Sequence, residues 1–364
     1  MQSRTILSVL CIVALFAVPA TAQYTDSLET GKAELQSAGI LAFGPEGVLF
    51  VGDSMGAAIY AIDTGDHAAG AAQRVDIQGI DMQVAAMLGT APDQILINDM
   101  AVNPISKNVY LSVSRGTGPD AMPVILRVTA SGSIDELSLD NVAHSKVMLP
   151  NAPEQGAGRA SRARLQTITD LAFADGRVFI AGLSNEEFSS KLRSIPFPFD
   201  SVDEGTSVEI FHGNHGRLET NSPVRTFVPY MIDSEPHILA AYTCTPLVTF
   251  PVADLQPGQK ILGHTIAELG SGNRPLDMII YSKGGADHIL MSNSSRGVMK
   301  MSAKGLNGYD HIGAPLRSSA TAGVPYETLD LDDVVQLDQL GAGLALILTR
   351  ANTGSMNLQT IALP

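Results

Sequence analysis

The sequence predicts an all-β fold, a β-propeller with six blades, because one strand–turn–strand phrase recurs along the chain. The phrase is clearest at 97–116, INDMAVNPISKNVYLSVSRG, where two apolar strands flank a polar turn. It returns at 39–54, 168–184, 275–297 and 331–354. A strand pair that recurs at blade-sized intervals is typical of a radial β repeat. With 45% hydrophobic residues, the chain can fill the core of such a ring.

The first 22 residues predict export. Arg4 gives a positive start, 6–18 form a short apolar run, and Ala20-Thr21-Ala22 fits a signal-peptidase site before Gln23. The apolar run is too short to span a membrane, and Cys11 lies inside it rather than at its end, which disfavours a lipid anchor. We therefore expect a mature chain starting at Gln23, secreted or periplasmic, without a membrane span and monomeric.

Six units follow the signal in order, each with strands separated by Gly-rich turns. A short helix is expected between the first two units at 80–90, and a surface loop at 140–164. The units are expected at about 37–80, 95–139, 165–228, 229–270, 273–320 and 326–364. Seven blades are the alternative, because 140–164 or 303–325 could hide further strands.

Two segments do not fit the repeat. The polar residues 24–36 are either a loose arm or an outer strand that closes the ring against the C-terminal blade, since closure removes exposed strand edges. Residues 185–206 are predicted to be a loop insertion, because Pro196 and Pro198 do not suit a regular strand. A long loop is often functional, but its Phe residues could equally pack on the propeller. The whole of 23–364 is predicted to be one domain.

Charge and composition exclude some partners. The net charge of −14 disfavours nucleic acid and anionic membranes, which require basic patches. The chain has no tryptophan, which disfavours a quinone or sugar stacked on indole rings. After loss of Cys11, Cys244 is the one remaining cysteine, so no intrachain disulfide can form.

Four units place an aspartate at the start of the inner strand, where the blades meet the axis. These are Asp99, Asp170, Asp277 and Asp333, with Ile40 and Pro229 at the matching positions of the other two units. Close carboxylates repel one another unless a cation, a proton or a partner group neutralises them. The ring could hold Ca²⁺ or Mg²⁺, which prefer oxygen ligands, or each carboxylate could accept hydrogen bonds from backbone N–H groups in its own turn, once per blade.

The turns between second and third strands would share the face on which the inner strands begin. Candidate ligand-binding residues in these turns are Arg115, Arg296, Asn185, Glu186, Cys244 and Arg350. Arg115 and Arg296 occupy equivalent SRG phrases in the second and fifth units, which are expected to face each other across the axis of a six-bladed ring. They could clamp an anion, or each could pair with a neighbouring aspartate.

Two other groups are weaker candidates. Cys244 could be a nucleophile or soft-metal ligand, although a single cysteine is more often a buried small residue. His212 and His215, in FHGNHG, have a spacing that could bind a metal, but a Gly/Asn-rich turn is the commoner reason for such a phrase. Metalloprotease, lipase, P-loop and haem-attachment motifs are absent from the sequence.

The phrases LAFGPEGVLFVGDS…IYAID and MAVNPISKNVYLSVSRG…ILRV resemble the repeats of secreted NHL-like and SMP-30/gluconolactonase-like six-bladed propellers. This resemblance covers most of the mature chain. It implies a divalent cation at the axis, with Asp99, Asp170, Asp277 and Asp333 in positions comparable to the family's ligands, and lactonase chemistry.

Two functions remain open from the sequence. The first is an exported propeller that binds a small ligand or a partner protein on its loop-rich face, without catalysis. The alternative is a divalent-cation-dependent hydrolase or lactonase, in which the Asp ring holds the metal and Arg115 or Arg296 orients an anionic substrate. The alternative requires three carboxylates that converge on one point.

Overall fold

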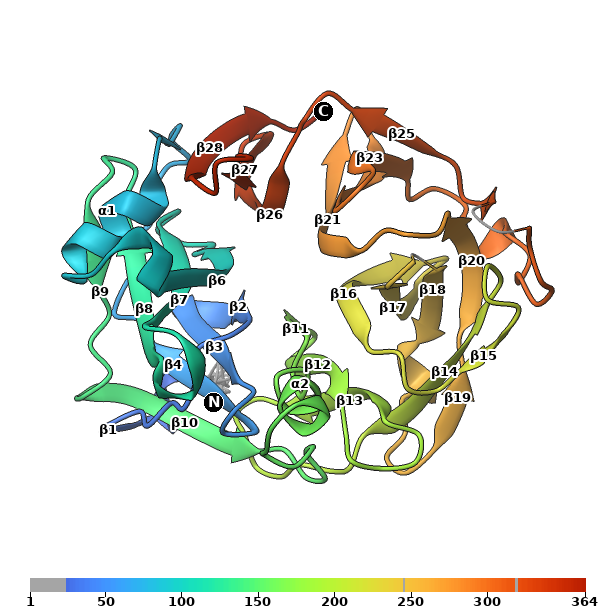
Figure 1. The fold of residues 1–364 in the computed structure, drawn as a ribbon, viewed down its shortest axis with the longest axis horizontal. Helices are drawn as coiled ribbons and strands as arrows, with labels where there is room; N and C mark the ends of the chain where they lie inside the picture. The colour runs from blue at the N-terminus through green and yellow to red at the C-terminus, as the bar shows by residue number, and fades with distance from the viewer. Residues whose placement is uncertain (1–23, 245, 318–319) are drawn as a thin grey trace, which may run out of the picture.

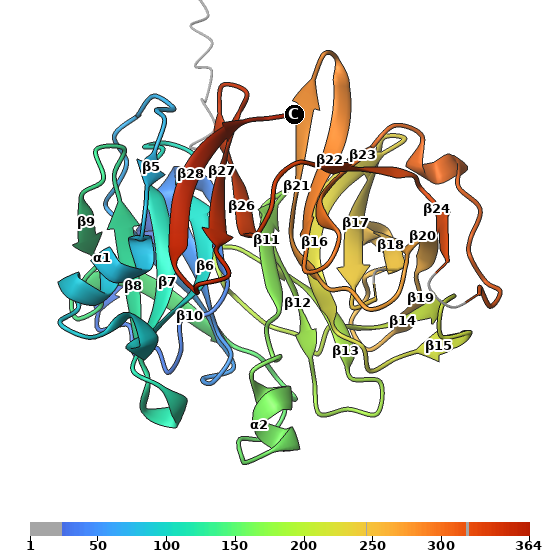
Figure 2. The same ribbon diagram turned by 45° about the horizontal axis from the view of Figure 1, so that its top comes forward.

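A computed structural model describes residues 24–244, 246–317 and 320–364, and shows six β-sheets arranged as blades around a central axis. Figure 1 looks along this axis, and Figure 2 shows the same ring tilted. The inner strands of neighbouring blades contact one another all the way round. The predicted six-bladed propeller is confirmed. The predicted signal peptide, Cys11 included, lies outside the described residues.

Each blade begins with an inner strand at the axis and continues outward through antiparallel neighbours. Blade 1 contains β2 (Leu41–Phe43), β3 (Val48–Asp53), β4 (Ala58–Asp63), β10 (Val142–Met148) and β1 (Glu29–Gly31). Blade 2 contains β6 (Ile95–Val102), β7 (Val109–Arg115), β8 (Met122–Val128) and β9 (Ile134–Glu136). Blade 3 contains β11 (Asp170–Ala174), β12 (Arg177–Leu183), β13 (Ser190–Pro196), β14 (Thr206–His212), β15 (Arg217–Glu219) and, parallel to β14, β19 (Lys260–Leu262).

The remaining blades follow the same plan. Blade 4 contains β16 (Val224–Ile232), β17 (Glu235–Tyr242), β18 (Pro246–Pro251), β20 (His264–Leu269) and β24 (Thr321–Gly323). Blade 5 contains β21 (Pro275–Lys283), β22 (Ala286–Asn293), β23 (Gly297–Ser302) and β25 (Tyr326–Leu329). Blade 6 contains β26 (Val334–Gly341), β27 (Leu344–Arg350), β28 (Met356–Ala362) and β5 (Asp76–Ile77).

The order of blades around the ring differs from their order along the chain. The inner-strand contacts run β2–β6–β26–β21–β16–β11 and back to β2, so blade 2 lies between blades 1 and 6, and blade 1 between blades 2 and 3. The first two blades have therefore exchanged places relative to a sequential ring. Blade 2 faces blade 4 across the axis, not blade 5.

Two long-range pairings complete the exchanged blades. After β4, the chain crosses to blade 6, where β5 pairs with the C-terminal strand β28. After blade 2, the chain returns and β10 pairs with β4 of blade 1. The ring is thus closed by N- and C-terminal strands, as predicted, but the closing strand is Asp76–Ile77. The polar arm 24–36 instead contributes β1, which pairs with β10.

The second strand of each blade carries the core, because both of its faces are covered by neighbouring blades. In β3, for example, all six residues of VLFVGD are buried. Such continuous burial requires close backbone approach at some positions. In the second strand β12, a Cβ at buried Gly182 would lie 1.9 Å from the carbonyl oxygen of Thr167, so only glycine fits there.

The helices are short. The helix expected at 80–90 is confirmed as α1 (Ile80–Met87). The predicted loop 140–164 instead contains β10 and α2 (Arg159–Arg164). Short 3₁₀ turns occupy Tyr24–Ser27, Pro45–Gly47, Pro92–Gln94, Gly118–Asp120, Val252–Asp254 and Leu306–Gly308. In the described part of the chain, none of the helices has the length and hydropathy to cross a bilayer.

The predicted loop insertion at 185–206 is wrong in its extent, because β13 runs through it from Ser190 to Pro196. β14 pairs with β13 only at Lys191 and Leu192. Pro196 is therefore tolerated, because the N–H group that proline lacks is not needed for a hydrogen bond to β14. Beyond the strand, the Phe197 ring is buried and lies 4.9 Å from the Phe50 ring, centroid to centroid. Phe197 and Phe50 therefore belong to the core, as the packing interpretation of these Phe residues expected.

Candidate functional site

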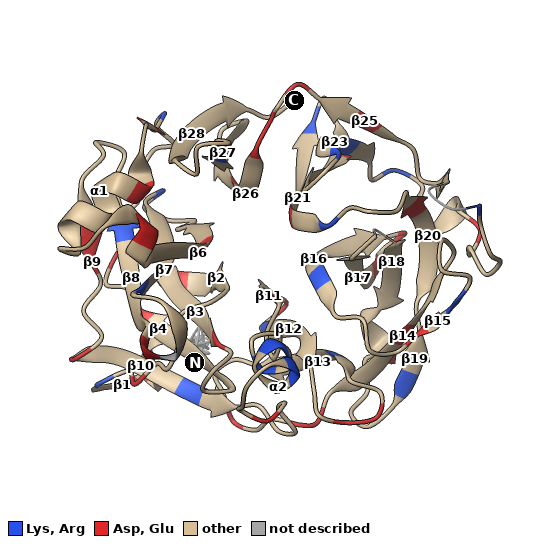
Figure 3. Ribbon diagram, in the orientation of Figure 1, with Lys and Arg blue, Asp and Glu red and all other residues tan. Residues whose placement is uncertain are grey.

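The inner strands enclose an axial cavity of about 370 Å³. Its polar lining comprises Asp99, Asp170, Asp277, Asp338 and Gln339. The rest of the lining is apolar and includes Phe43, Phe173 and Phe227, with no Lys or Arg among the described lining residues. Figure 3 shows acidic positions on strands that face the central opening, among them β21 and β26. The site is therefore an acidic and partly aromatic chamber at the axis.

A recurrent bulge places side chains at the axis in equivalent positions. The register of the two innermost strands shifts between Ile97 and Asp99 in blade 2, and between Pro275 and Asp277 in blade 5. The same shift occurs before Thr226 in blade 4 and before Gln336 in blade 6. The residue after the bulge is thus Asp99, Asp277, Thr226 or Gln336, and Asp170 lies at the corresponding start of β11.

Each of these carboxylates bridges two blades. Asp99 Oδ2 accepts the Leu41 N–H at 2.7 Å, Asp170 Oδ2 the Phe227 N–H at 2.6 Å, Asp277 Oδ2 the Leu337 N–H at 2.8 Å, and Asp338 Oδ2 the Val102 N–H at 2.7 Å. In the first three pairs, the N–H donor belongs to the neighbouring blade. It is the residue directly after the position that corresponds there to the aspartate. Backbone N–H groups thus bind these carboxylates, but the four bonds link neighbouring blades, whereas the sequence interpretation expected donors in each aspartate's own turn.

The prediction of Asp333 in this ring is wrong. Asp333 precedes β26 with φ +59°, and its backbone carbonyl accepts the Arg350 N–H at 2.9 Å. The bulge before Gln336 puts the amide of Gln336 in the expected place and Asp338 two residues further along the same face. The predicted match at Pro229 is also displaced, because Thr226 occupies the equivalent position in blade 4. Asp99, Asp170 and Asp277 lie on the cavity wall as predicted.

Gln336 connects two of the aspartates. With its amide oriented to satisfy hydrogen bonding, the nitrogen donates to Asp99 Oδ1 at 2.7 Å and to Asp277 Oδ2 at 3.0 Å. Two carboxylates on either side of blade 6 thus share one amide donor. In the described part of the chain, no three carboxylate, imidazole or thiol ligand atoms of this chamber lie within 4.8 Å of one another. The metal role of the ring stays a prediction.

Burial raises the pKa of every aspartate in the chamber. The pKa of Asp99 is raised to about 8, of Asp170 to about 7 and of Asp338 to about 6, in each case chiefly by burial and against backbone hydrogen bonds that lower it. The pKa of Asp277 is raised well above its ordinary value by burial, then by the charge of Asp99. The chamber therefore gains negative charge in the neutral pH range.

The predicted arginines do not line the chamber. Arg115 ends β7, beside Ile95 at the start of β6, and Arg350 ends β27; both are exposed. Arg296 donates to the carbonyl oxygen of Ser271 at 3.3 Å. The predicted opposition of Arg115 and Arg296 is wrong, because blade 6 alone separates blades 2 and 5 once the first two blades exchange places.

The other candidates also lie away from the axial cavity. Asn185 is exposed, and its N–H donates to the Asn151 carbonyl at 2.7 Å. Glu186 Oε2 lies 2.5 Å from Nζ of buried Lys191, which makes Glu186 the counter-ion of a buried cation. Cys244 is a half-buried free thiol with φ +62°, and its N–H donates to the Asn273 carbonyl. Their predicted ligand-binding roles remain predictions.

The cavity lining does not include the turns that the sequence analysis favoured. It comes from the inner strands alone, whereas Arg115 at the end of β7 lies beside Ile95, the first residue of β6. Gln336 and Asp338 were missed because the residue after the bulge in blade 6 is a glutamine, so Asp333 before the strand was taken for the axial residue. The alternation of Gln336 and Asp338 in VVQLDQL was the available signal, since residues two apart share a face.

The fold defines the chain as a β-propeller. No protein-family model matches it, and no curated protein does. Solved structures similar to it include the PQQ-bound aldose sugar dehydrogenase of Streptomyces coelicolor, at 14% identity over 92% of this chain and 96% of that one, with a TM-score of 0.32.

Two further solved structures are similar over the same share of the chain. A putative oxidoreductase (glucose dehydrogenase) of Thermus thermophilus is 14% identical over 92% of this chain and all of that one, with a TM-score of 0.30. The WD40 β-propeller domain of Doa1 is 9% identical over 92% of this chain and 95% of that one, with a TM-score of 0.31. At these values the similarities carry no argument about function, and NHL-like or SMP-30-like membership stays a prediction.

Proposed function

We propose that this protein is an exported, non-catalytic binding propeller whose axial cavity takes a small organic cation. One observation carries the proposal: a cavity of about 370 Å³ has four aspartates and no Lys or Arg among its described lining residues. An ammonium group would neutralise carboxylates that otherwise repel one another in a buried site.

The apolar part of the lining favours an organic ligand over a bare ion. Phe43, Phe173 and Phe227 offer ring surface to an apolar body or to the cation itself. Each aspartate already accepts backbone hydrogen bonds in fixed directions, which leaves fewer free lone pairs than an oxygen cage for Ca²⁺ requires. A ligand that needs only one or two charge contacts suits this chamber better.

Calorimetric titration of the mature protein with 2-phenylethylamine tests this, with 2-phenylethanol as the neutral control of the same shape. We expect the amine to bind at pH 8 and more weakly at pH 5, where the chamber carboxylates are protonated. The alcohol should not bind. Asp99→Asn and Asp277→Asn should each weaken amine binding about tenfold or more, by analogy with loss of a charged hydrogen bond.

The control variant is Asp254→Asn, on an exposed 3₁₀ turn at the rim. Circular dichroism should confirm that each variant is folded. Equal binding of amine and alcohol, or no binding of the amine at either pH, would overturn the proposal. Binding of Ca²⁺ alone that disappears in Asp99→Asn would instead favour the axial-cation hydrolase.

Export is part of the proposal and rests on the leader sequence. The N-terminal sequence of the protein recovered outside the cytoplasm should begin at Gln23. Recovery of a chain that still carries residues 1–22 would contradict it.

A further inference from the structure

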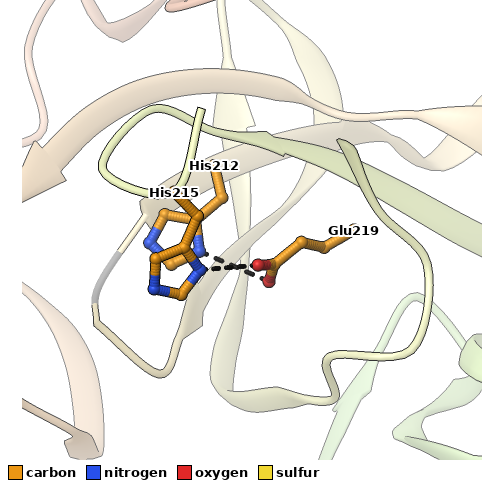
Figure 4. A group of neighbouring side chains, drawn as sticks. All are labelled: His212, His215 and Glu219. Carbon is orange, nitrogen blue, oxygen red and sulfur yellow. Dashed lines mark hydrogen bonds and ion pairs between the residues drawn. The ribbon is translucent and has the colours of Figure 1, made fainter. Parts of the chain in front are cut away.

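A second cluster of side chains lies at the outer rim, away from the axial cavity. It is built on the β14–β15 hairpin of blade 3, where His212 ends β14 and Glu219 ends β15. Glu219 pairs with Ile210, two residues before His212, so Glu219 and His212 share one face of the hairpin. The Gly-rich turn between the strands then folds His215 over His212, with ring centroids 3.8 Å apart (Figure 4).

Three ligand atoms converge in this cluster. Glu219 Oε2 lies 3.3 Å from His212 Nδ1, and Glu219 Oε1 lies 2.6 Å from His215 Nδ1. All three ligand atoms lie within 4.8 Å of one another, and no other such group of His, Cys, Asp or Glu occurs among the described residues. Figure 4 shows both imidazoles turned toward the one carboxylate. Two nitrogens and an oxygen at this spacing match the ligand set of Zn²⁺ sites.

Buried His212 has a carboxylate near each ring nitrogen but forms a hydrogen bond with neither. The His212 side chain is 1% exposed, and neither of its ring nitrogens has a hydrogen bond of acceptable geometry within the described part of the chain. Buried polar groups are normally hydrogen-bonded, and leaving one unsatisfied is costly. A cation bound to Nδ1 would satisfy one of these two nitrogens.

An outer carboxylate lies near the other nitrogen. Glu268 on β20 of blade 4 is fully buried, and its Oε2 lies 3.8 Å from His212 Nε2. Glu268 is itself fixed by the Gly213 N–H and by Asn214 Nδ2, which lies 3.0 Å from Oε2. Ser222 Oγ donates to Glu219 Oε2 at 2.6 Å. Metal-binding histidines usually have such a carboxylate behind them, because it fixes the tautomer and orients the ring.

We propose that His212, His215 and Glu219 form a Zn²⁺-binding site with Glu268 as the outer carboxylate. The His215 side chain is 40% exposed, so a fourth position of a tetrahedral ion faces solvent and can take water or a small anion. Borderline nitrogen ligands with one carboxylate favour Zn²⁺ over Ca²⁺ or Mg²⁺. The ion would fasten the turn of the hairpin to blade 4 through Glu268. This site is independent of the axial chamber.

Zinc titration of untagged mature protein after dialysis against a chelator tests the site, with elemental analysis of the protein as purified. We expect one Zn²⁺ per chain and a raised unfolding midpoint with excess Zn²⁺, since binding selects the folded state. His215→Ala and Glu219→Gln should weaken binding by about a hundredfold or more. Glu268→Gln should weaken it by roughly 10- to 100-fold, as is typical for outer partners.

Two control variants are available in the chain. His67 is an exposed histidine 3.0 Å from Asp63 without a third ligand, so His67→Ala should bind Zn²⁺ like the wild type. Cys244→Ser should do the same, which separates this site from thiol chemistry. Absence of Zn²⁺ binding by the wild type, or binding that His215→Ala and Glu219→Gln leave unchanged, would overturn the proposal. If a variant is unfolded by circular dichroism, the wild-type titration and Glu268→Gln decide the matter.

Discussion

Replacement of Asp170 by asparagine tests whether an axial carboxyl group is neutral in the folded protein at mildly acidic pH. Asp170 Oδ1 accepts the Leu171 N–H at 2.8 Å, and Oδ2 accepts the Phe227 N–H at 2.6 Å. Burial raises the pKa from 3.8 to about 7. Between these two values, the folded state binds a proton that the unfolded state has lost.

The direction follows from proton linkage. An acid whose pKa is raised by folding makes its most favourable contribution below the unfolded pKa, and that contribution declines as pH rises to the folded pKa. Between pH 5 and pH 8, the titration of Asp170 should lower the free energy of unfolding of the wild type by roughly 2–3 kcal/mol. Asparagine does not titrate. The difference, variant minus wild type, should therefore rise by that amount over the same range.

A pH-independent offset is expected as well. The asparagine amide presents its nitrogen to one of the two backbone donors, so the variant loses a hydrogen bond worth about 1–3 kcal/mol in a buried site. Asp170→Asn should accordingly be less stable than the wild type at pH 5 and approach or exceed it at pH 8. Urea unfolding followed by circular dichroism at several pH values measures both quantities. Asp254→Asn serves as the control and should show neither.

A constant difference between pH 5 and pH 8 would refute the raised pKa. A difference that falls as pH rises would show a depressed pKa, as expected when a cation occupies the chamber. The urea unfolding series should then be repeated with 2-phenylethylamine. A bound ammonium group stabilises the ionised carboxylate, so the stability difference between variant and wild type should depend less on pH.

Three further perturbations test other parts of the fold. Glu186→Gln removes the counter-ion of buried Lys191 and should lower the free energy of unfolding by about 2–3 kcal/mol, less than for a fully buried pair because Glu186 is partly exposed. Glu187→Gln, at an exposed position, is the control and should leave the free energy of unfolding measured in urea unchanged. Phe197→Ala should cost about 3–4 kcal/mol and lower the thermal midpoint more than Phe199→Ala does, whereas similar small shifts for both would restore the loop interpretation of this segment. Ile77→Asp buries a charge in the closing strand β5 and should lower the thermal midpoint, with Gln78→Asp, at the exposed next position, as the matched control; equal midpoints would mean that β5 contributes nothing to closure.

The sequence was sufficient for the architecture because the signals that define a blade are local. Alternating apolar residues and glycine turns mark each inner hairpin, and the recurring aspartate marks the axis. Asp99, Asp170 and Asp277 could be located by counting from the turns. The count failed in blade 6, where the axial position holds Gln336 instead of an aspartate and two acidic residues precede the strand.

Features that depend on contacts between distant segments could not be predicted in the same way. Nothing local distinguishes a ring of blades in chain order from one with blades 1 and 2 exchanged, so the opposition of Arg115 and Arg296 was inferred from the wrong neighbours. The histidine pair in FHGNHG was visible, but Glu268 reaches it from another blade. Pro196 suggested a loop because the sequence does not show where β14 leaves β13.

The exchange of blades 1 and 2 has a consequence for the order in which the protein can be assembled. The Val75 N–H donates to the Thr360 hydroxyl, and β5 pairs with β28. β5 therefore cannot find its partner until β28, the last strand, has been synthesised. Blade 1 likewise stays incomplete until β10 has followed blade 2 out of the ribosome. A nascent chain therefore exposes unpaired sheet edges until these distant strands have been made. Truncation before β28 would therefore leave blade 6 incomplete and would leave β5, near the start of the chain, without its partner strand.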